Sequence, residues 1–293
     1  MIERVLEMLS ARWLIHRDTA LSYLPMLIAF LNGNEHFASM MPMAEEEKRS
    51  KPRVLAMGSE PGAMVQYEFD DPCIPDNSIA VIPILGTILS WKSMNIIDSI
   101  RKAENNENII AILFPTNSPG GMVFYTDILA KEIKDCQKPT VASIMNMSAS
   151  AAMWITSAMD YRIATSPMDW IGSIGVFTSY TDMQVLLKDK LGITITDIYA
   201  TLSTRKNEMS RALLEGNKKP IIDDLDFVNE IFHAAIRENL GIKADSEVFT
   251  GAIYNANEAI THRLINEINS LDYAIDYAYK AGLTHKINNY KFI

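Results

Sequence analysis

The sequence predicts an α/β fold with largely parallel strands, and two features of the chain lead to this prediction. Short apolar runs, which are typical of buried strands, occur at residues 79–86, 109–114, 140–145 and 161–164. Segments with the character of helices separate these runs at residues 96–104 and 123–134 and from residue 151 onward. Since parallel strands need a crossover connection that is usually a helix, this alternation favours a sheet covered by helices.

The first 60 residues differ from this pattern. Val5, Leu6, Leu9 and Trp13 recur at helical spacing, which predicts a helix. A charged run at 45–49, flanked by prolines, then indicates a linker. We therefore divide the chain into a helical prefix with its linker (1–60), a main domain (61–285) and a short tail (286–293).

The second half of the main domain continues the alternation. The segment Gly-Ser-Ile-Gly-Val-Phe at 172–177 is followed by an expected helix to Leu191 and an expected strand at 194–199. From residue 220 to 240, apolar residues recur at helical spacing. This pattern predicts a long amphipathic helix that packs on the core or on a neighbouring subunit.

Composition excludes several classes of function. The formal net charge of -9 argues against a nucleic-acid partner, which would require clustered Lys and Arg. Cys73 and Cys136 form no CxxC and no zinc spacing, so we expect neither a disulfide framework nor a metal, and no organic cofactor. No secretory signal is evident, and the early apolar run at 24–31 is far shorter than the roughly 20 residues of a membrane span, so we expect a cytoplasmic protein without a membrane anchor.

The turn at 118–121, Ser-Pro-Gly-Gly, follows an expected buried strand and precedes an expected helix. Gly120 and Gly121 permit close backbone approach, and free N–H groups at such a turn can bind developing negative charge. An oxyanion hole requires both properties. Alternatively, Ser-Pro-Gly-Gly is an ordinary turn without a catalytic role, since these residue types are common in turns.

Ser150 lies where an expected strand meets a helix of small residues that begins with Ala151. A nucleophilic serine needs this placement, with the N–H of Ala151 as an adjacent oxyanion donor. Alternatively, Ser148 and Ser150 are N-caps of an alanine-rich helix.

The distribution of histidines narrows the choice of general base, since residues 37–232 contain no histidine. A lysine, which must be neutral to accept a proton, is the remaining common activator of a serine. Lys206 lies in the polar stretch 203–208 after the last expected strand. A lysine in such a loop is otherwise a solvated surface charge.

Taken together, the segments resemble one family. The runs SIAVIPILGTI, NSPGG, KPTVASIMNMSASAAMWITSAMD, GSIGVF, STRKN and FTGAIYNANEAITHRLINEI occur in the order found in the signal peptide peptidase (protease IV) family of serine peptidases, over about residues 78–270. The order of these six motifs carries the resemblance, and the main domain is then the catalytic one. The chain departs from the family at Ala151-Ala152, where Gly-Gly is more usual, and at Arg263 and Asn266, where Gly and Asp are usual.

The resemblance implies a fold like that of the Clp protease and the crotonases, with repeated β-β-α units and assembly into homo-oligomeric rings. It implies that Ser150 is the nucleophile and Lys206 the general base, and that Ser173 orients the lysine. It also implies that Gly121 and the backbone of Ala151 form the oxyanion hole, with Gly120 permitting the turn. The substrate would be a polypeptide, and activity would rise toward mildly alkaline pH.

Within the family, the chain looks more like the prohead proteases of phages and prophages, which cleave scaffold and capsid proteins, than like anchored enzymes that cleave signal peptides. The site of action would then be the host cytoplasm or the prohead. Two other classes remain open. A crotonase-like acyl-CoA enzyme would use a carboxylate base and would not need Ser150. An inactive structural member of a ring would use Ser150 as a helix cap and Lys206 as a surface charge.

Overall fold

The structure is a computed structural model that describes residues 13–15, 50–58, 64–179, 189, 192 and 196–290. Its centre is a mixed sheet in the order β11-β10-β8-β6-β4-β2-β3, with β5, β9 and β12 paired beside this path. The strands are β2 (Arg53–Met57), β3 (Met64–Glu68), β4 (Ser78–Val81), β5 (Ile84–Leu85), β6 (Ile109–Ser118), β8 (Thr140–Ala149), β9 (Tyr161–Ala164), β10 (Trp170–Gly172), β11 (Ile253–Asn255) and β12 (Glu267–Ile268). A separate pair joins β1 (Trp13–Ile15) to β7 (Gly120–Met122).

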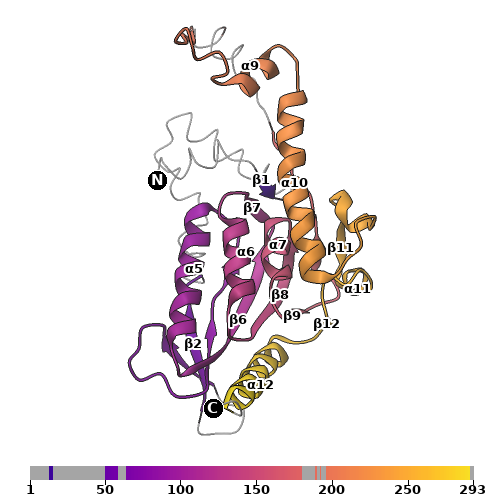
Figure 1. Cartoon of the computed structure of the whole chain (residues 1–293). Helices are drawn as coiled ribbons and strands as arrows, with labels where there is room; N and C mark the ends of the chain where they lie inside the picture. The colour runs from indigo at the N-terminus through magenta and orange to yellow at the C-terminus, as the bar shows by residue number, and fades with distance from the viewer. Residues whose placement is uncertain are drawn as a thin grey trace.

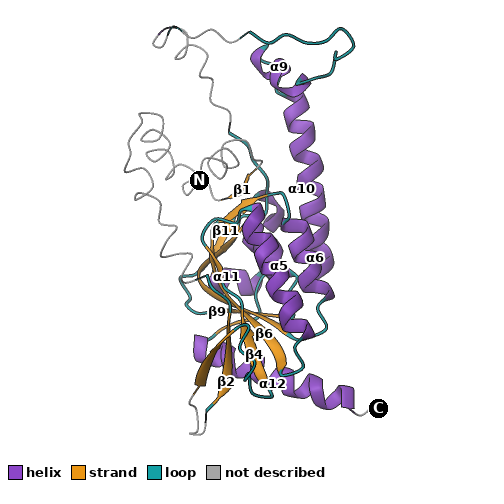
Figure 2. Ribbon diagram, turned by 90° about the vertical axis from the view of Figure 1, so that its left-hand side faces the viewer, coloured by secondary structure: helices purple, strands orange, loops and turns teal. Residues whose placement is uncertain are grey.

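The helices lie on both faces of the sheet (Figures 1 and 2). They are α5 (Ser90–Asn105), α6 (Thr126–Asp135), α7 (Ala151–Ser157), α9 (Glu208–Leu214), α10 (Lys219–Leu240), α11 (Ala256–Thr261) and α12 (Leu271–Tyr290), with a 3-10 turn at Glu247–Thr250. Helices α5, α6 and α7 lie side by side, α10 packs on α7, and α12 packs on β4, β6 and β8. The amino-terminal part of α10 projects beyond the sheet and carries α9 at its end (Figure 1).

Two apolar clusters on opposite faces of the sheet hold these layers together. Because successive side chains of a strand point to opposite faces, β6 places Ile112 and Phe114 in the cluster under α5–α7 and places Ala111 and Leu113 in the cluster under α12. The backbone of α12 lies very close to β6, since a Cβ added at Gly282 would stand 2.7 Å from Ile110 Cγ1. The parallel strands are thus buried on both faces, which explains why they appear as continuous apolar runs.

The predicted α/β class is confirmed. Strands β4, β6, β8, β9 and β10 pair in parallel, whereas the pairs β2–β3, β2–β4 and β10–β11 are antiparallel. The helices expected at 96–104, 123–134 and 220–240 correspond to α5, α6 and α10. The apolar run at 79–86 is divided into β4 and β5 around Pro83, which has no N–H to donate to a ladder.

Some sequence expectations differ from the structure. The strand expected at 194–199 is wrong where the structure describes it, since 196–200 belong to no helix or strand. Trp13, expected in a helix, lies in a strand, because its segment pairs with an available strand edge. Residues 53–57, assigned to the linker, form β2 and pair with β4, so the sheet begins upstream of residue 61. Most of the expected prefix helix and of the helix ending at Leu191 lies outside the described residues.

Within the described part of the chain, no helix has the length and apolarity needed to cross a bilayer.

Candidate active site

Ser150 occupies the junction between β8 and α7 in a strained backbone conformation, with φ 55° and ψ −117°. A positive φ is unusual for a residue with a side chain and persists only where the surroundings enforce it. Here the Ser150 N–H donates to the Gly172 carbonyl at 2.8 Å, and the Ser150 carbonyl accepts from the Trp154 N–H at 3.0 Å. A sharp strand-to-helix turn with a strained serine is a recurrent way to hold a nucleophile.

Ser148, the alternative serine, has a different environment. Its hydroxyl lies 3.0 Å from the Thr156 hydroxyl, and both residues are buried. The pair satisfies two polar groups inside the protein, as buried hydroxyls require. Neither Ser148 nor Ser150 caps α7 with its side chain, since the helix shows no such hydrogen bond at its N-cap.

The glycine turn lies beside this junction and depends on both of its glycines. Gly120 has a φ of 99°, which few residues other than glycine adopt. At Gly121 an added Cβ would stand 1.9 Å from the carbonyl oxygen of Ile88, so no side chain fits. The Ser118 hydroxyl fixes the turn, since it donates to the Gly86 carbonyl at 2.6 Å and accepts from the Gly120 N–H at 3.1 Å.

The register of the sheet brings the serine and the glycines together. Ser118 of β6 pairs with Ser148 of β8 where both strands end, so Gly120–Gly121 and Ser150–Ala151 follow side by side. The carboxyl ends of parallel strands are where open α/β sheets commonly bind ligands. Ala151 begins a helix, and the first N–H groups of a helix have no partner within it. Ser150, Gly121 and Ala151 are therefore close enough for one site.

Ser173 lies on the other side of Ser150. Gly172 of β10 pairs in parallel with Ala149 of β8, so the next residues, Ser173 and Ser150, are also neighbours. Ser173 has a φ of 53°, and its N–H donates to the Ala252 carbonyl at 2.6 Å. Sequence reasoning singled out Ser173 but not Gly172, whose carbonyl holds the Ser150 N–H. The Gly-Ser-Ile-Gly motif was the available signal.

Lys206 is not brought to this site within a single chain. It is exposed and lies two residues before α9, at the far end of the arm that α10 forms (Figures 1 and 2). The part of α10 from Lys219 to its anchor at Phe232 alone spans about 20 Å at the usual rise per residue. The structure thus assembles the serine and the glycines but leaves the predicted base on a projecting arm.

His233 shows a contact that sequence distance concealed. Helix α10 carries its ring close to the Ile174 backbone, one residue beyond Ser173. Its ring also packs against Phe249, with centroids 4.7 Å apart. Burial lowers the pKa of His233, which favours a neutral imidazole. The absence of histidines from residues 37–232 therefore does not mean that no imidazole lies near the site.

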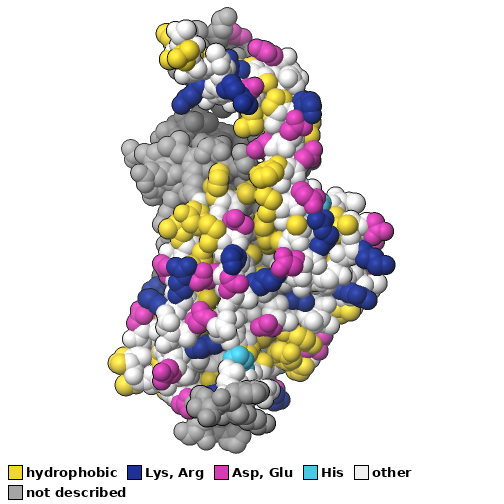
Figure 3. Space-filling view, in the orientation of Figure 1, with side chains coloured by type: hydrophobic (Ala, Val, Ile, Leu, Met, Phe, Trp, Pro, Cys, Tyr) yellow, Lys and Arg dark blue, Asp and Glu magenta, His cyan; other side chains and the backbone are white. Residues whose placement is uncertain are grey.

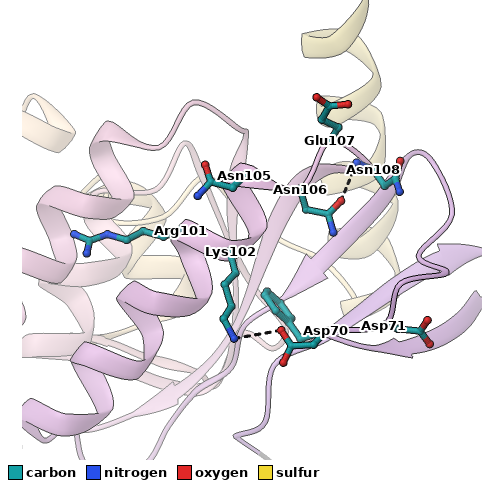
Figure 4. Close-up of a pocket in the computed structure, with 9 residues that line it drawn as sticks. Asp70, Asp71, Arg101, Lys102, Asn105, Asn106, Glu107 and Asn108 are labelled. Atoms are coloured by element: carbon teal, nitrogen blue, oxygen red, sulfur yellow. Dashed lines mark hydrogen bonds and ion pairs between the residues drawn. The ribbon is translucent and has the colours of Figure 1, made fainter.

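A surface hollow lies at the opposite end of the sheet and is unrelated to Ser150 (Figure 4). It is lined by Phe69, Asp70, Asp71, Arg101, Lys102 and residues 105–108, which lead into the amino end of β6. The Lys102 ammonium lies 3.2 Å from the Asp70 carboxylate, so charges of opposite sign neutralise each other there.

Comparisons with known proteins point to one family of peptidases. Residues 132–283 match the family described as Peptidase family S49. The chain is 29% identical over 239 residues to "Protease 4" of Haemophilus influenzae, a match that covers 72% of this chain and 37% of that protein. It is 25% identical over 198 residues to "Putative signal peptide peptidase SppA" of Enterococcus faecium, covering 64% and 55%. For "Serine protease SPPA, chloroplastic" of Arabidopsis thaliana, the identity is 24% over 199 residues, covering 62% and 28%.

The chain thus spans between about a quarter and somewhat over half of the length of these relatives. The family match covers more than half of the chain and includes Ser150, Ser173 and Lys206, while the glycine turn precedes it. By this match the chain belongs to peptidase family S49.

Proposed function

We propose that this protein is a serine endopeptidase that hydrolyses peptide bonds with a Ser150–Lys206 dyad. The observation that carries the proposal is the strained Ser150 at the end of β8, beside Gly121 and Ala151, in a chain of a peptidase family. Backbone strain at a buried turn has to be compensated by the surrounding structure, and a helix cap alone does not require it.

The proposed mechanism gives each of these groups one role. Neutral Lys206 accepts the proton of the Ser150 hydroxyl, and the oxygen attacks the peptide carbonyl carbon. The N–H groups of Gly121 and Ala151 stabilise the tetrahedral oxyanion. Lys206 then donates the proton to the leaving amine, and water hydrolyses the acyl-enzyme through the same groups. Ser173, in register with Ser150, orients the lysine.

Lys206 reaches Ser150, in this proposal, from the arm of a second copy of the chain. The arm exposes the apolar side chains of Leu214, Ile222, Phe227 and Ile231, and apolar side chains follow α10 in Figure 3. Exposed apolar surface on a projecting helix is typical of an interface between subunits. Because each chain has a nucleophile at one place and its base at another, head-to-tail contacts would complete every site in a closed ring.

The repeated order β4–β5–α5 and β6–β7–α6 supports a Clp protease/crotonase-like fold, which we propose together with ring assembly. For substrates, we propose either capsid and scaffold proteins of a phage prohead or segments like signal peptides. The name of the Enterococcus faecium relative favours the second of these.

Parallel purification of the wild type, Ser150→Ala and Lys206→Ala tests the proposal. Casein hydrolysis and covalent labelling by a fluorophosphonate are measured after assembly has been compared by light scattering. We expect both variants to lose hydrolysis and labelling while assembling normally. Full casein hydrolysis by Ser150→Ala would mean that Ser150 is not the nucleophile, and a wild type that neither hydrolyses casein nor is labelled would support an acyl-CoA enzyme or a structural role.

His233→Gln is the matched control for the identity of the base. This substitution keeps a polar side chain of similar size on α10 but removes the basic nitrogen. We expect it to retain hydrolysis, because the base is Lys206. Loss of activity in His233→Gln together with retained activity in Lys206→Ala would transfer the role of base to the imidazole.

A further inference from the structure

The strand β1 lies along the edge of the glycine strand β7. The two are antiparallel, with Trp13 opposite Met122, Leu14 opposite Gly121, and Ile15 opposite Gly120. On its other edge β7 is bonded to Ile88, whose N–H donates to the Gly120 carbonyl at 2.9 Å and whose carbonyl accepts from the Met122 N–H at 2.8 Å. Since polar groups of successive strand residues point to alternate sides, the N–H and carbonyl of Gly121 face β1.

A substrate would need this same edge. In the proposed function, the carbonyl oxygen of the scissile bond sits between the N–H groups of Gly121 and Ala151, so the substrate main chain runs beside Gly121. An extended peptide binds to an open strand edge by adding a further strand, with backbone hydrogen bonds providing affinity. The edge of β7 that faces away from Ile88 is the edge available for that purpose, and β1 occupies it.

We propose that Trp13–Ile15 is an internal competitor that occupies the main-chain position of the substrate and restrains the peptidase. This inference rests on the proposed function. The segment is joined to the domain by its own chain, so its effective concentration at the edge is on the order of millimolar. A substrate must displace it, and segments with several apolar residues in extended form compete best, because Trp-Leu-Ile is the sequence that the edge receives.

The surroundings of β7 fit an apolar strand. Leu89 and Met122 are buried and pack with the partly buried Trp91 in a small cluster apart from the two main ones. Phe124, Tyr125 and Ile128, which follow β7 in the chain, are exposed. An edge flanked by apolar side chains selects peptides whose alternate residues are apolar.

A reversible cross-link tests the competition. Since the N–H and carbonyl of Gly121 face β1, Leu14 and Gly121 form a hydrogen-bonded pair of the antiparallel ladder, and Trp13 and Met122 form the next, non-hydrogen-bonded pair. Non-hydrogen-bonded pairs have Cα atoms about 4.5 Å apart, a separation that a disulfide tolerates. The variant carries Trp13→Cys and Met122→Cys, with Cys73→Ser and Cys136→Ala to remove the native thiols. The matched control carries Ile15→Cys in place of Trp13→Cys, and the register places Ile15 two pairs away from Met122.

Casein hydrolysis is measured with each variant oxidised and then reduced. We expect the Trp13 variant to form a disulfide within one chain, to lose nearly all activity when oxidised, and to regain it with dithiothreitol. An oxidised variant that is fully active would overturn the inference, as would a link between two chains or a control that cross-links as readily. If neither the wild type nor the reduced variant hydrolyses casein, the peptidase assignment fails and this inference fails with it.

Discussion

Mixing two inactive variants should restore activity if the arm of one chain serves the serine of the next. The Ser150→Ala chain keeps Lys206, and the Lys206→Ala chain keeps Ser150. In a ring of randomly mixed chains at equal amounts, a site works when a Lys206→Ala chain is followed by a Ser150→Ala chain. The probability of that order is one half times one half, so about a quarter of wild-type activity should return.

The assay is casein hydrolysis after co-refolding of the two variants, with different affinity tags to prove that mixed assemblies formed. Fluorophosphonate should label only the Lys206→Ala chain, because it alone retains the nucleophile. Each variant refolded by itself is the control and should remain inactive. If mixed assemblies form but neither hydrolysis nor labelling returns, the dyad is not shared between chains and the arm must reach Ser150 of its own chain.

Three further predictions concern single residues. Gly121→Ala should abolish hydrolysis, because its Cβ would stand 1.9 Å from the Ile88 carbonyl oxygen, and hydrolysis at the wild-type rate would exclude Gly121 from the oxyanion hole. Cys136 should react with iodoacetamide far more slowly than the exposed Cys73, because burial raises the pKa of the Cys136 thiol to about 11. About one Cys136 thiol in a thousand is then ionised at pH 8. Equal rates for the two cysteines, measured by mass spectrometry, would contradict the burial of Cys136. Arg263→Gly should raise the free energy of unfolding by about 1 kcal/mol, because Arg263 has a φ of 61°, and unchanged urea denaturation would argue against strain there.

The buried parts of the fold could be predicted from the sequence because their signals are local. A parallel strand covered on both faces must be apolar throughout, and β6 and β8 could be recognised for that reason. The small residues that follow Ser150 predicted the turn there, since a helix needs small residues to pack closely against a sheet. Arg263 and Asn266, where the chain departs from the family, are both exposed. The Asn266 side chain also accepts from the Arg162 backbone N–H at 2.9 Å and so helps to join β9 to the segment before β12.

The remainder depends on partners that are distant in the sequence. A three-residue strand has no intrinsic stability, and β1 exists because the edge of β7 is available to it. Trp13 continues the helical spacing of Val5, Leu6 and Leu9, so local periodicity predicted the wrong structure for Trp13. The position of Lys206 is likewise set by the length and packing of α10, which the motif around the lysine does not encode. The approach of His233 to Ile174 has the same origin.

One aromatic contact links the proposed nucleophile to the arm. Trp154, whose N–H donates to the Ser150 carbonyl, stacks on Phe232 of α10, with ring centroids 4.8 Å apart and an interplanar angle of 11°. Phe232 is fully buried, whereas the amino-terminal part of α10, which precedes Phe232, projects from the domain. The helix that keeps Ser150 in its strained conformation is therefore the same helix that anchors the arm. In the proposed assembly, contact of the arm with a neighbouring chain would act on α7 through this stack, and assembly would thereby be coupled to the geometry of Ser150.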